Sequence, residues 1–255
     1  MDIAKSGQVL ITTHSSIFIN EDIFGKFHVV RKVDGKTKIH TLSLEKFTEQ
    51  VGALFEIDTH VESTVASLST SLSLKVKEIF FSKFVIIVEG QEDYGYLQTA
   101  ISLYGNKKRF LEGGYNIVPA LGKNDISPVI ELCKAFKIPF FVVFDSDSDS
   151  AKKENGIKKT NIRLRKQLDS PDSEPLHDEI EYNDLFWAWP RDIKESLVNE
   201  HADFQDYLNK AKTLCGCKNF KNAKLTSIAV QEYFNAKGKL KPLERLLDHI
   251  SGFLV

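Results

Sequence analysis

Acidic side chains follow two apolar runs of this chain, and their types and spacing could hold a divalent cation. Glu89 follows 85–88 directly, and Asp145 and Asp147 follow 141–144. Such Val-, Ile- and Phe-rich runs are typical of strands buried on both faces of a parallel sheet. Carboxylates just past such strands meet at the carboxyl edge of an open sheet, where ligands bind. Because converging carboxylates repel one another and oxygen ligands suit Mg²⁺, Mn²⁺ or Ca²⁺, the pattern predicts a cation site.

The acidic segments also have simpler interpretations. The Asp-rich segment 145–149 is similar to a calcium loop, but an EF-hand needs Gly at its sixth position and Glu at its twelfth. Those positions hold Ser150 and Gly156, so the EF-hand interpretation fails. A solvated acidic loop remains the alternative. For Asp93, the alternative is stabilisation of a helix start through the helix dipole.

Later residues could add to such a site. Asp192 and Glu195 follow the apolar run 185–189 and open a predicted helix. One of them could be a further metal ligand, or both could stabilise the helix start. Lysines cluster before Pro242, at Lys237, Lys239 and Lys241. One of these could stabilise negative charge on a phosphate in the transition state, and a solvated loop is the alternative.

Strands and helices alternate through the middle of the chain, where these side chains must be positioned. The periodicity predicts strands over 84–88, 115–119 and 138–144 and helices over 93–104 and 126–136. This order indicates parallel βαβ units, and right-handed crossovers place them in one sheet. A further strand is predicted over 185–189, followed by a mainly helical C-terminal part.

The flanking segments have weaker patterns. Residues 8–12 read as a buried strand, residues 28–41 as a hairpin around Asp34-Gly35, and residues 44–55 as a helix. Residues 72–81 read as a short amphipathic helix, and residues 170–181 as an acidic loop. The basic stretch 152–166 could neutralise phosphates without reading bases, or form a solvated helix face.

The bulk composition is that of an ordinary soluble globular protein. The chain has 255 residues, a net charge of −1 and 42% hydrophobic residues. It has no apolar run long enough for a membrane span and no signal-peptide core, so we expect a cytoplasmic protein. Cys133, Cys215 and Cys217 form neither a disulfide framework nor a four-ligand zinc set, and we expect reduced thiols.

The Glu89-Gly90 turn and the Asp145-Ser-Asp147 pair resemble the Toprim domain. That domain occurs in type IA and type II topoisomerases, bacterial primases, RNase M5 and OLD-family nucleases. The resemblance implies that Glu89, Asp145 and Asp147 are catalytic and organise Mg²⁺ or Mn²⁺ at the edge of a mostly parallel sheet flanked by helices. Ca²⁺ would be an inactive substitute.

The flanking motifs resemble the OLD (overcoming lysogenization defect) family more closely. Residues 8–15 look like the last strand and switch histidine of an ABC-type ATPase head, which in OLD nucleases precedes Toprim through a hairpin-bearing linker. The resemblance implies a DNA substrate, a homodimer, and Asp93 as an additional metal ligand. It also implies a later acid, here Asp192 or Glu195, and a lysine near a Lys-Pro pair. That lysine would be Lys241, or equally Lys239 or Lys237.

The resemblance divides the chain into three parts. Residues 1–75 would be the end of an ATPase head and a hairpin linker, residues 76–150 the Toprim core, and residues 151–255 a basic helical insertion, the last Toprim strand and C-terminal helices. The chain lacks a G-x-x-x-x-G-K-[ST] loop, so we expect that it does not bind ATP alone and that the ATPase domain is missing.

We therefore expect a two-metal DNA endonuclease. The alternatives are a non-catalytic cation-binding dimerisation module, a topoisomerase-, primase- or RNase M5-like Toprim enzyme, and a phosphatase-like domain with Asp145 as nucleophile.

Overall fold

The computed structural model describes residues 7, 9–19, 26–105, 107–151, 155–170 and 179–253. Within this part of the chain, five strands form a central sheet in the order β4-β3-β5-β7-β6. The first four are parallel and β6 is antiparallel to β7. Their bounds are β3 Phe84–Val88, β4 Tyr115–Pro119, β5 Phe140–Asp145, β6 Glu181–Tyr182 and β7 Phe186–Trp189. The predicted α/β fold with a mostly parallel sheet is confirmed.

Apolar residues fill both faces of the sheet, which is why its strands read as continuous apolar runs. Alternate residues of β3 point to opposite faces, so Ile86 and Val88 join one hydrophobic core while Val85 and Ile87 join the other. All four are fully buried. Two layers of helices therefore sandwich the sheet.

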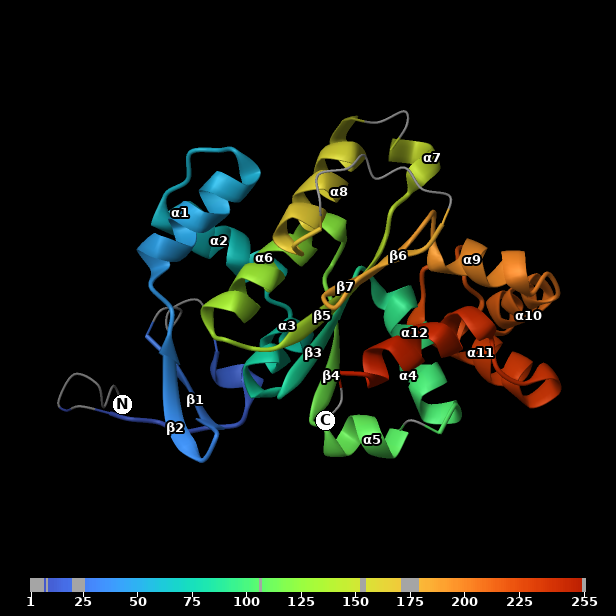
Figure 1. The fold of residues 1–255 in the computed structure, drawn as a ribbon, viewed down its shortest axis with the longest axis horizontal. Coiled ribbons are helices and arrows are strands. Elements are labelled where there is room, and N and C mark those ends of the chain that lie inside the picture. The colour runs from blue at the N-terminus through green and yellow to red at the C-terminus, as the bar shows by residue number, and fades with distance from the viewer. Residues whose placement is uncertain are drawn as a thin grey trace.

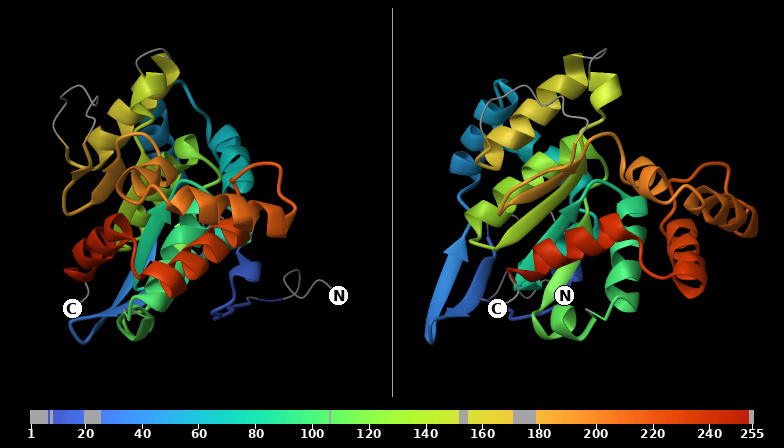
Figure 2. Two further views of the ribbon diagram at one scale, coloured as in Figure 1. Left: turned by 90° about the vertical axis from the view of Figure 1, so that its right-hand side faces the viewer. Right: turned by 45° about the vertical axis from the view of Figure 1, so that its right-hand side comes forward.

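Helices far apart in sequence share each face (Figure 1). One face is covered by α4 Gln91–Leu103, α9 Ile193–Glu200, α10 Phe204–Cys215, α11 Ala223–Lys237 and α12 Lys241–Ser251. The other face is covered by α1 Leu44–Phe55, α3 Leu74–Lys77, the 3₁₀ turn η4 Glu78–Phe81, α6 Lys123–Ala135 and α8 Asn155–Gln167. Figure 2 shows the C-terminal helices α9–α12 as one group beside α4. The remaining helical pieces are η2 Ser16–Phe18, α2 Val61–Ser71, α5 Lys107–Glu112 and α7 Ser148–Ala151.

The N-terminal hairpin forms where Asp34-Gly35 predicted it. Strands β1 His28–Val33 and β2 Lys36–Thr41 pair in antiparallel register. Asp34 and Gly35 both have positive φ, 50° and 74°, which suits a two-residue hairpin turn. The hairpin is not part of the central sheet, but Val29 packs into the core shared with α1 and α6.

The strand predicted over residues 8–12 is wrong for the residues that are described. Gln8 lies outside the described residues, and residues 9–12 form neither strand nor helix. Leu10 is 89% exposed instead of buried. A strand needs a neighbour to accept and donate its backbone hydrogen bonds, and these residues have no partner strand in the described part of the chain.

The loop predicted over 170–181 is corrected at its end. Residues 171–178 lie outside the described residues, but Glu181 belongs to the edge strand β6. Its carboxylate holds the guanidinium of Arg165, which is only 3% exposed. Arg165 was one of the cations of the basic stretch 152–166, and its burial shows that part of this stretch is structural.

Helix α8 keeps only some of its cations available to a ligand. Arg163 donates a hydrogen bond to Asn124 Oδ1 and lies over the Phe55 ring. Lys159 and Lys166 are exposed, while Lys152 and Lys153 lie outside the described residues. No helix within the described ranges is both long and apolar enough to span a membrane.

Candidate metal centre

Glu89 lies in the turn between β3 and α4, and Asp93 lies in the first turn of α4. Gly90 is the N-cap of α4, and its backbone N–H donates to Oδ2 of Asp93 at 2.8 Å. This capping contact fixes the Asp93 carboxylate beside the end of β3. Asp93 is only 4% exposed, which is far more burial than helix-start stabilisation requires.

Asp145 ends the neighbouring strand β5, and Asp147 lies in the loop that follows. Three backbone N–H groups tie this loop to the segment after β7: Ser146 to the Trp189 carbonyl, Asp147 to that of Arg191 and Ser148 to that of Pro190. From α8, the buried Asn161 donates to the Ser146 carbonyl at 2.6 Å. Asp147 has a left-handed φ of 45°. The loop is thus held from two sides, and its two carboxylates face the β3 turn.

Burial and repulsion from neighbouring carboxylates make Asp93 and Asp145 hard to ionise. Burial raises the pKa of Asp93 to about 8, Glu89 adds to this rise, and the Gly90 N–H opposes it. Burial likewise raises the pKa of Asp145 well above its usual range, with Asp93, Glu89, Asp147 and Asp192 contributing. We call Glu89, Asp93, Asp145 and Asp147 the carboxylate cluster. Each member of it acts electrostatically on another, so the structure brings these four predicted residues together.

Lys123 completes this arrangement, and the sequence analysis missed it. It begins α6 after β4, the third strand to end at this edge. Its ammonium forms an ion pair with Asp147 and lies 4.0 Å from Oε2 of Glu89. Burial raises the pKa of Glu89, Lys123 opposes the rise, and Asp147 adds to it. A lysine directly after Gly122 in the loop following a buried strand was the available signal.

The two later acids behave differently. Asp192 caps α9 by accepting the Glu195 N–H at 2.6 Å, and it is close enough to raise the pKa of Asp145 and of Glu92. Glu195 instead pairs with Arg191. The structure therefore favours Asp192 over Glu195 as a further member of the site. Glu92 is an acidic residue that the sequence analysis did not single out, and its pKa is raised mainly by burial.

The structure does not bring the predicted lysines to this edge. Lys239 lies 5.6 Å from the ring of Tyr104, which follows the C-terminal end of α4. Lys241 donates its backbone N–H to His201, after the end of α9. Because α4 starts at the cluster and spans roughly 20 Å, its length separates these lysines from Glu89. Lys221, before α11, does act on both Glu89 and Glu92, and it lowers the pKa of each.

The oxygen atoms of the carboxylate cluster suit a hard divalent cation. In this structure the ammonium of Lys123 pairs with two of these carboxylates. Glu89 Oε2 and Asp145 Oδ1 are buried without a hydrogen-bond partner, which is costly unless something else satisfies them. All available donors are oxygens, as Mg²⁺ and Mn²⁺ prefer. Among the described residues, however, no three acidic, histidine or cysteine side chains are arranged to hold an ion. Lys123 is the cation that two of these carboxylates contact.

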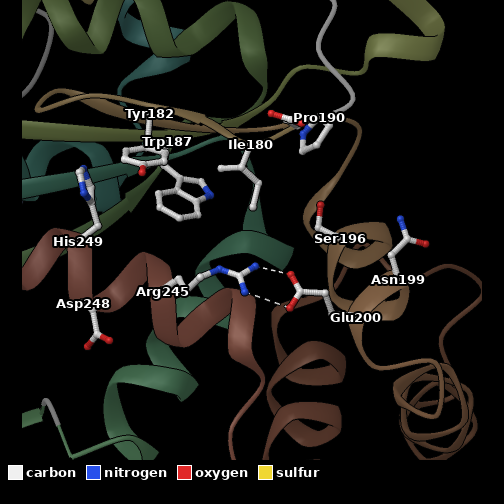
Figure 3. A pocket seen from close by; sticks show the side chains of 11 residues that line it. Ile180, Tyr182, Trp187, Pro190, Ser196, Asn199, Glu200, Arg245, Asp248 and His249 are labelled. Atoms are coloured by element: carbon white, nitrogen blue, oxygen red, sulfur yellow. Dashed lines mark hydrogen bonds and ion pairs between the residues drawn. The ribbon is translucent and has the colours of Figure 1, made fainter.

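A separate pocket of about 730 Å³ lies between β7, α9 and α12 (Figure 3). Tyr182 stacks on Trp187 at one end, and across the pocket Arg245 pairs with Glu200. None of the described residues that line it belongs to the carboxylate cluster. Pro190 and Ser196 border it, on either side of Asp192 in the sequence. The pocket therefore neighbours the candidate centre without being part of it.

The segment that contains the cluster also matches a known family. Residues 80–147 match the model for the Overcoming lysogenization defect protein-like, TOPRIM domain. This segment is an OLD-like Toprim domain. The Toprim segment holds β3, β4 and β5, all four residues of the carboxylate cluster, and Lys123.

Relatives of the Toprim segment extend beyond it. The chain is 26% identical over 206 residues to Endonuclease GajA of Bacillus cereus (strain HuB5-5), covering 74% of this chain and 29% of that protein. This chain thus spans under a third of that relative's length. It is similar to the C-terminal region of the Burkholderia pseudomallei OLD protein, with 18% identity and a TM-score of 0.41. It is also similar to the C-terminal region of the Xanthomonas campestris pv. campestris OLD protein, with 16% identity and a TM-score of 0.38. Each match covers 67% of this chain and 81% of the other.

Proposed function

We propose that this chain is the metal-dependent nuclease part of an OLD-type endonuclease and that it hydrolyses DNA phosphodiester bonds with two Mg²⁺ or Mn²⁺ ions. The observation that carries the proposal is the pair Glu89 and Asp145. They end adjacent parallel strands, and each presents a buried oxygen without a partner. The relation to an endonuclease supplies the reaction class.

Different residues of the site would hold the ions, position the ligands and offset the charge of the phosphate. Glu89, Asp145 and Asp147 would hold the ions, with Asp93 and Asp192 as further ligands. When bound, such ions activate water and stabilise the leaving oxygen. The tied loop after β5 keeps the ligands in place, and the Gly90 cap orients Asp93. Lys221 would offset negative charge on the phosphate, in place of Lys239 or Lys241.

Plasmid cleavage tests this proposal. We expect purified protein to nick or cut plasmid DNA with Mg²⁺ or Mn²⁺, and cleavage to fall at least about 100-fold in Asp145→Asn, because a lost metal ligand removes charge stabilisation. Asp149→Asn is the matched control, since Asp149 lies in the short helix α7 just after this loop but pairs with Arg191 outside the cluster. Equal cleavage by wild type and Asp145→Asn would refute the assignment.

A non-catalytic cation-binding module is the second candidate. It is favoured by the same two buried carboxylate oxygens, of Glu89 and Asp145, which a bound cation would satisfy without any catalysis. The two functions separate cleanly, because the module predicts metal-dependent stabilisation of the fold with no cleavage of DNA or RNA. The same plasmid assay, run beside a thermal melt with and without Mn²⁺, distinguishes them.

A further inference from the structure

Lys123 occupies an unusual position for a lysine. Gly122, whose φ of 140° favours glycine, delivers it to the first position of α6. Its side chain is only 10% exposed, and its ammonium contacts both Glu89 and Asp147. Lysine is seldom buried to this degree unless its charge is paired. Lys123 is therefore placed where a cation is needed.

The pairing balances a concentration of negative charge. Lys221 also acts on Glu89, but Lys221 is exposed, whereas Lys123 lies inside the cluster. The Glu89 oxygen nearest to Lys123, Oε2, has no hydrogen-bond partner. An ammonium and a divalent ion cannot both occupy the space between these two carboxylates. Metal binding at Glu89 and Asp147 therefore requires Lys123 to move.

We propose that Lys123 competes with divalent ions for Glu89 and Asp147 and that, once displaced, its ammonium binds a phosphate oxygen of the substrate. The inference rests on the proposed function of the cluster. The flexible four-carbon stem of lysine allows a short movement along the sheet edge, and its compact charge suits a phosphate. Since the phosphate must bind beside the ions, the released ammonium stays within the same site.

Mn²⁺ affinity measured without DNA tests the competition. Free Mn²⁺ is followed by its electron paramagnetic resonance signal, and all variants are measured at one neutral pH so that protons compete equally in each. We expect Lys123→Met to bind Mn²⁺ about tenfold more tightly than wild type, since it removes a positive charge from the ion's position. Lys123→Arg keeps the charge and should bind like wild type. Lys134→Met is the matched control, on the same helix but paired with Glu131.

Plasmid cleavage at saturating Mn²⁺ tests the phosphate contact. We expect Lys123→Met to cleave at least about tenfold more slowly despite its tighter metal binding, because a charge-assisted contact to the substrate is lost. Lys123→Arg should retain part of the rate, and Lys134→Met should retain all of it. Tighter metal binding with slower cleavage is a combination that a merely structural lysine does not produce.

Several outcomes overturn the inference. Unchanged or weaker Mn²⁺ binding by folded Lys123→Met excludes competition, and unchanged cleavage at saturating Mn²⁺ excludes the phosphate contact. Should Lys123→Met fail to fold, Lys123→Gln serves as the second neutral variant under the same criteria. If wild type binds Mn²⁺ no better than Asp145→Asn does, the proposed function fails as well. A failure confined to the Lys123 variants leaves that function standing.

Discussion

Asp93 shows how one side chain can serve the fold and the site together. Its Oδ2 accepts the Gly90 N–H and so starts α4, while its burial beside Glu89 disfavours its charge. The cap needs only an acceptor oxygen, which an amide also supplies. The cap therefore does not need an ionisable group, and the presence of one at a buried position is consistent with metal binding.

This separation gives a pH-dependent prediction. The Asp93 pKa is about 8 in the folded chain and near its usual value of 3.8 when unfolded, so the folded state holds an extra proton between these limits. Without metal, the free energy of unfolding should fall by up to about 1.4 kcal/mol per pH unit as pH rises towards 8. Asp93→Asn should make this slope shallower by the contribution of one proton, while Asp145 and Glu89, whose pKa values are also raised, still contribute. Urea unfolding in a chelator, from pH 5 to about 9, measures it.

The free energy of unfolding of Asp93→Asn at alkaline pH gives the clearest test of this prediction. Above the Asp93 pKa of about 8, the variant should be more stable than wild type without metal, since it has no buried charge to lose to repulsion. Added Mn²⁺ should stabilise wild type more than the variant. Parallel pH profiles for the two proteins would show that Asp93 is not the group that titrates.

At the scale of elements, the packing of α11 on α4 sets the position of Lys221. Gly95 on α4 lets the helices approach closely. A Cβ there would lie 2.1 Å from Thr226 Oγ1 and 2.5 Å from the Ala223 carbonyl oxygen. Thr226 also donates a hydrogen bond to the Glu92 carbonyl. Since Lys221 immediately precedes α11, the spacing of the two helices determines its distance from Glu89 and Glu92.

Gly95→Ala should therefore lower the free energy of unfolding by about 1–3 kcal/mol through overpacking, and should slow cleavage by moving Lys221. Gly156→Ala is the control, because a Cβ at this position in α8 meets no atom within 4 Å. That variant should be neutral or slightly stabilised. Urea unfolding measures the change in stability, and plasmid cleavage measures the change in rate. A Gly95→Ala protein as stable as wild type would show that the helices separate without cost.

The elements themselves were largely predictable from local pattern. The bounds predicted for 84–88, 115–119 and 44–55 are those of β3, β4 and α1. Continuous burial of the strands and strong amphipathicity of the helix leave these segments few alternatives. The predicted strand at 8–12 was wrong because strand formation needs a partner that local pattern cannot supply.

The candidate site was predictable only in part. Glu89 directly follows β3, Asp145 ends β5 and Asp147 comes two residues later, so their places at the ends of apolar runs were enough to predict that they meet. Lys123 is separated from β4 by Ala120, Leu121 and Gly122, and only the three-dimensional arrangement shows that it reaches Glu89 and Asp147. Lys239 and Lys241 were chosen for their place beside a proline. The lengths of α4 and α9, which place them away from the cluster, enter only with the fold.

In the whole molecule, one edge of the sheet brings together charged residues from segments far apart in the chain. The turn after β3, the loop after β5, the start of α6 and the start of α9 all contribute to it. The two hydrophobic cores hold these segments in place from both faces of the sheet. Helices α1 and α8, from the first and third expected parts of the chain, share one core with β3 and β5. The domain limits expected at residues 75 and 150 therefore remain a prediction.

Anomalous scattering from crystals soaked in Mn²⁺ is the most direct test for a metal centre at this edge of the sheet. We expect anomalous peaks among Glu89, Asp145 and Asp147, with Lys123 displaced from Asp147. Crystals of Asp145→Asn, soaked identically, should lose these peaks. Fully soaked wild-type crystals with no peak at the cluster, and with Lys123 still paired to Asp147, would contradict it.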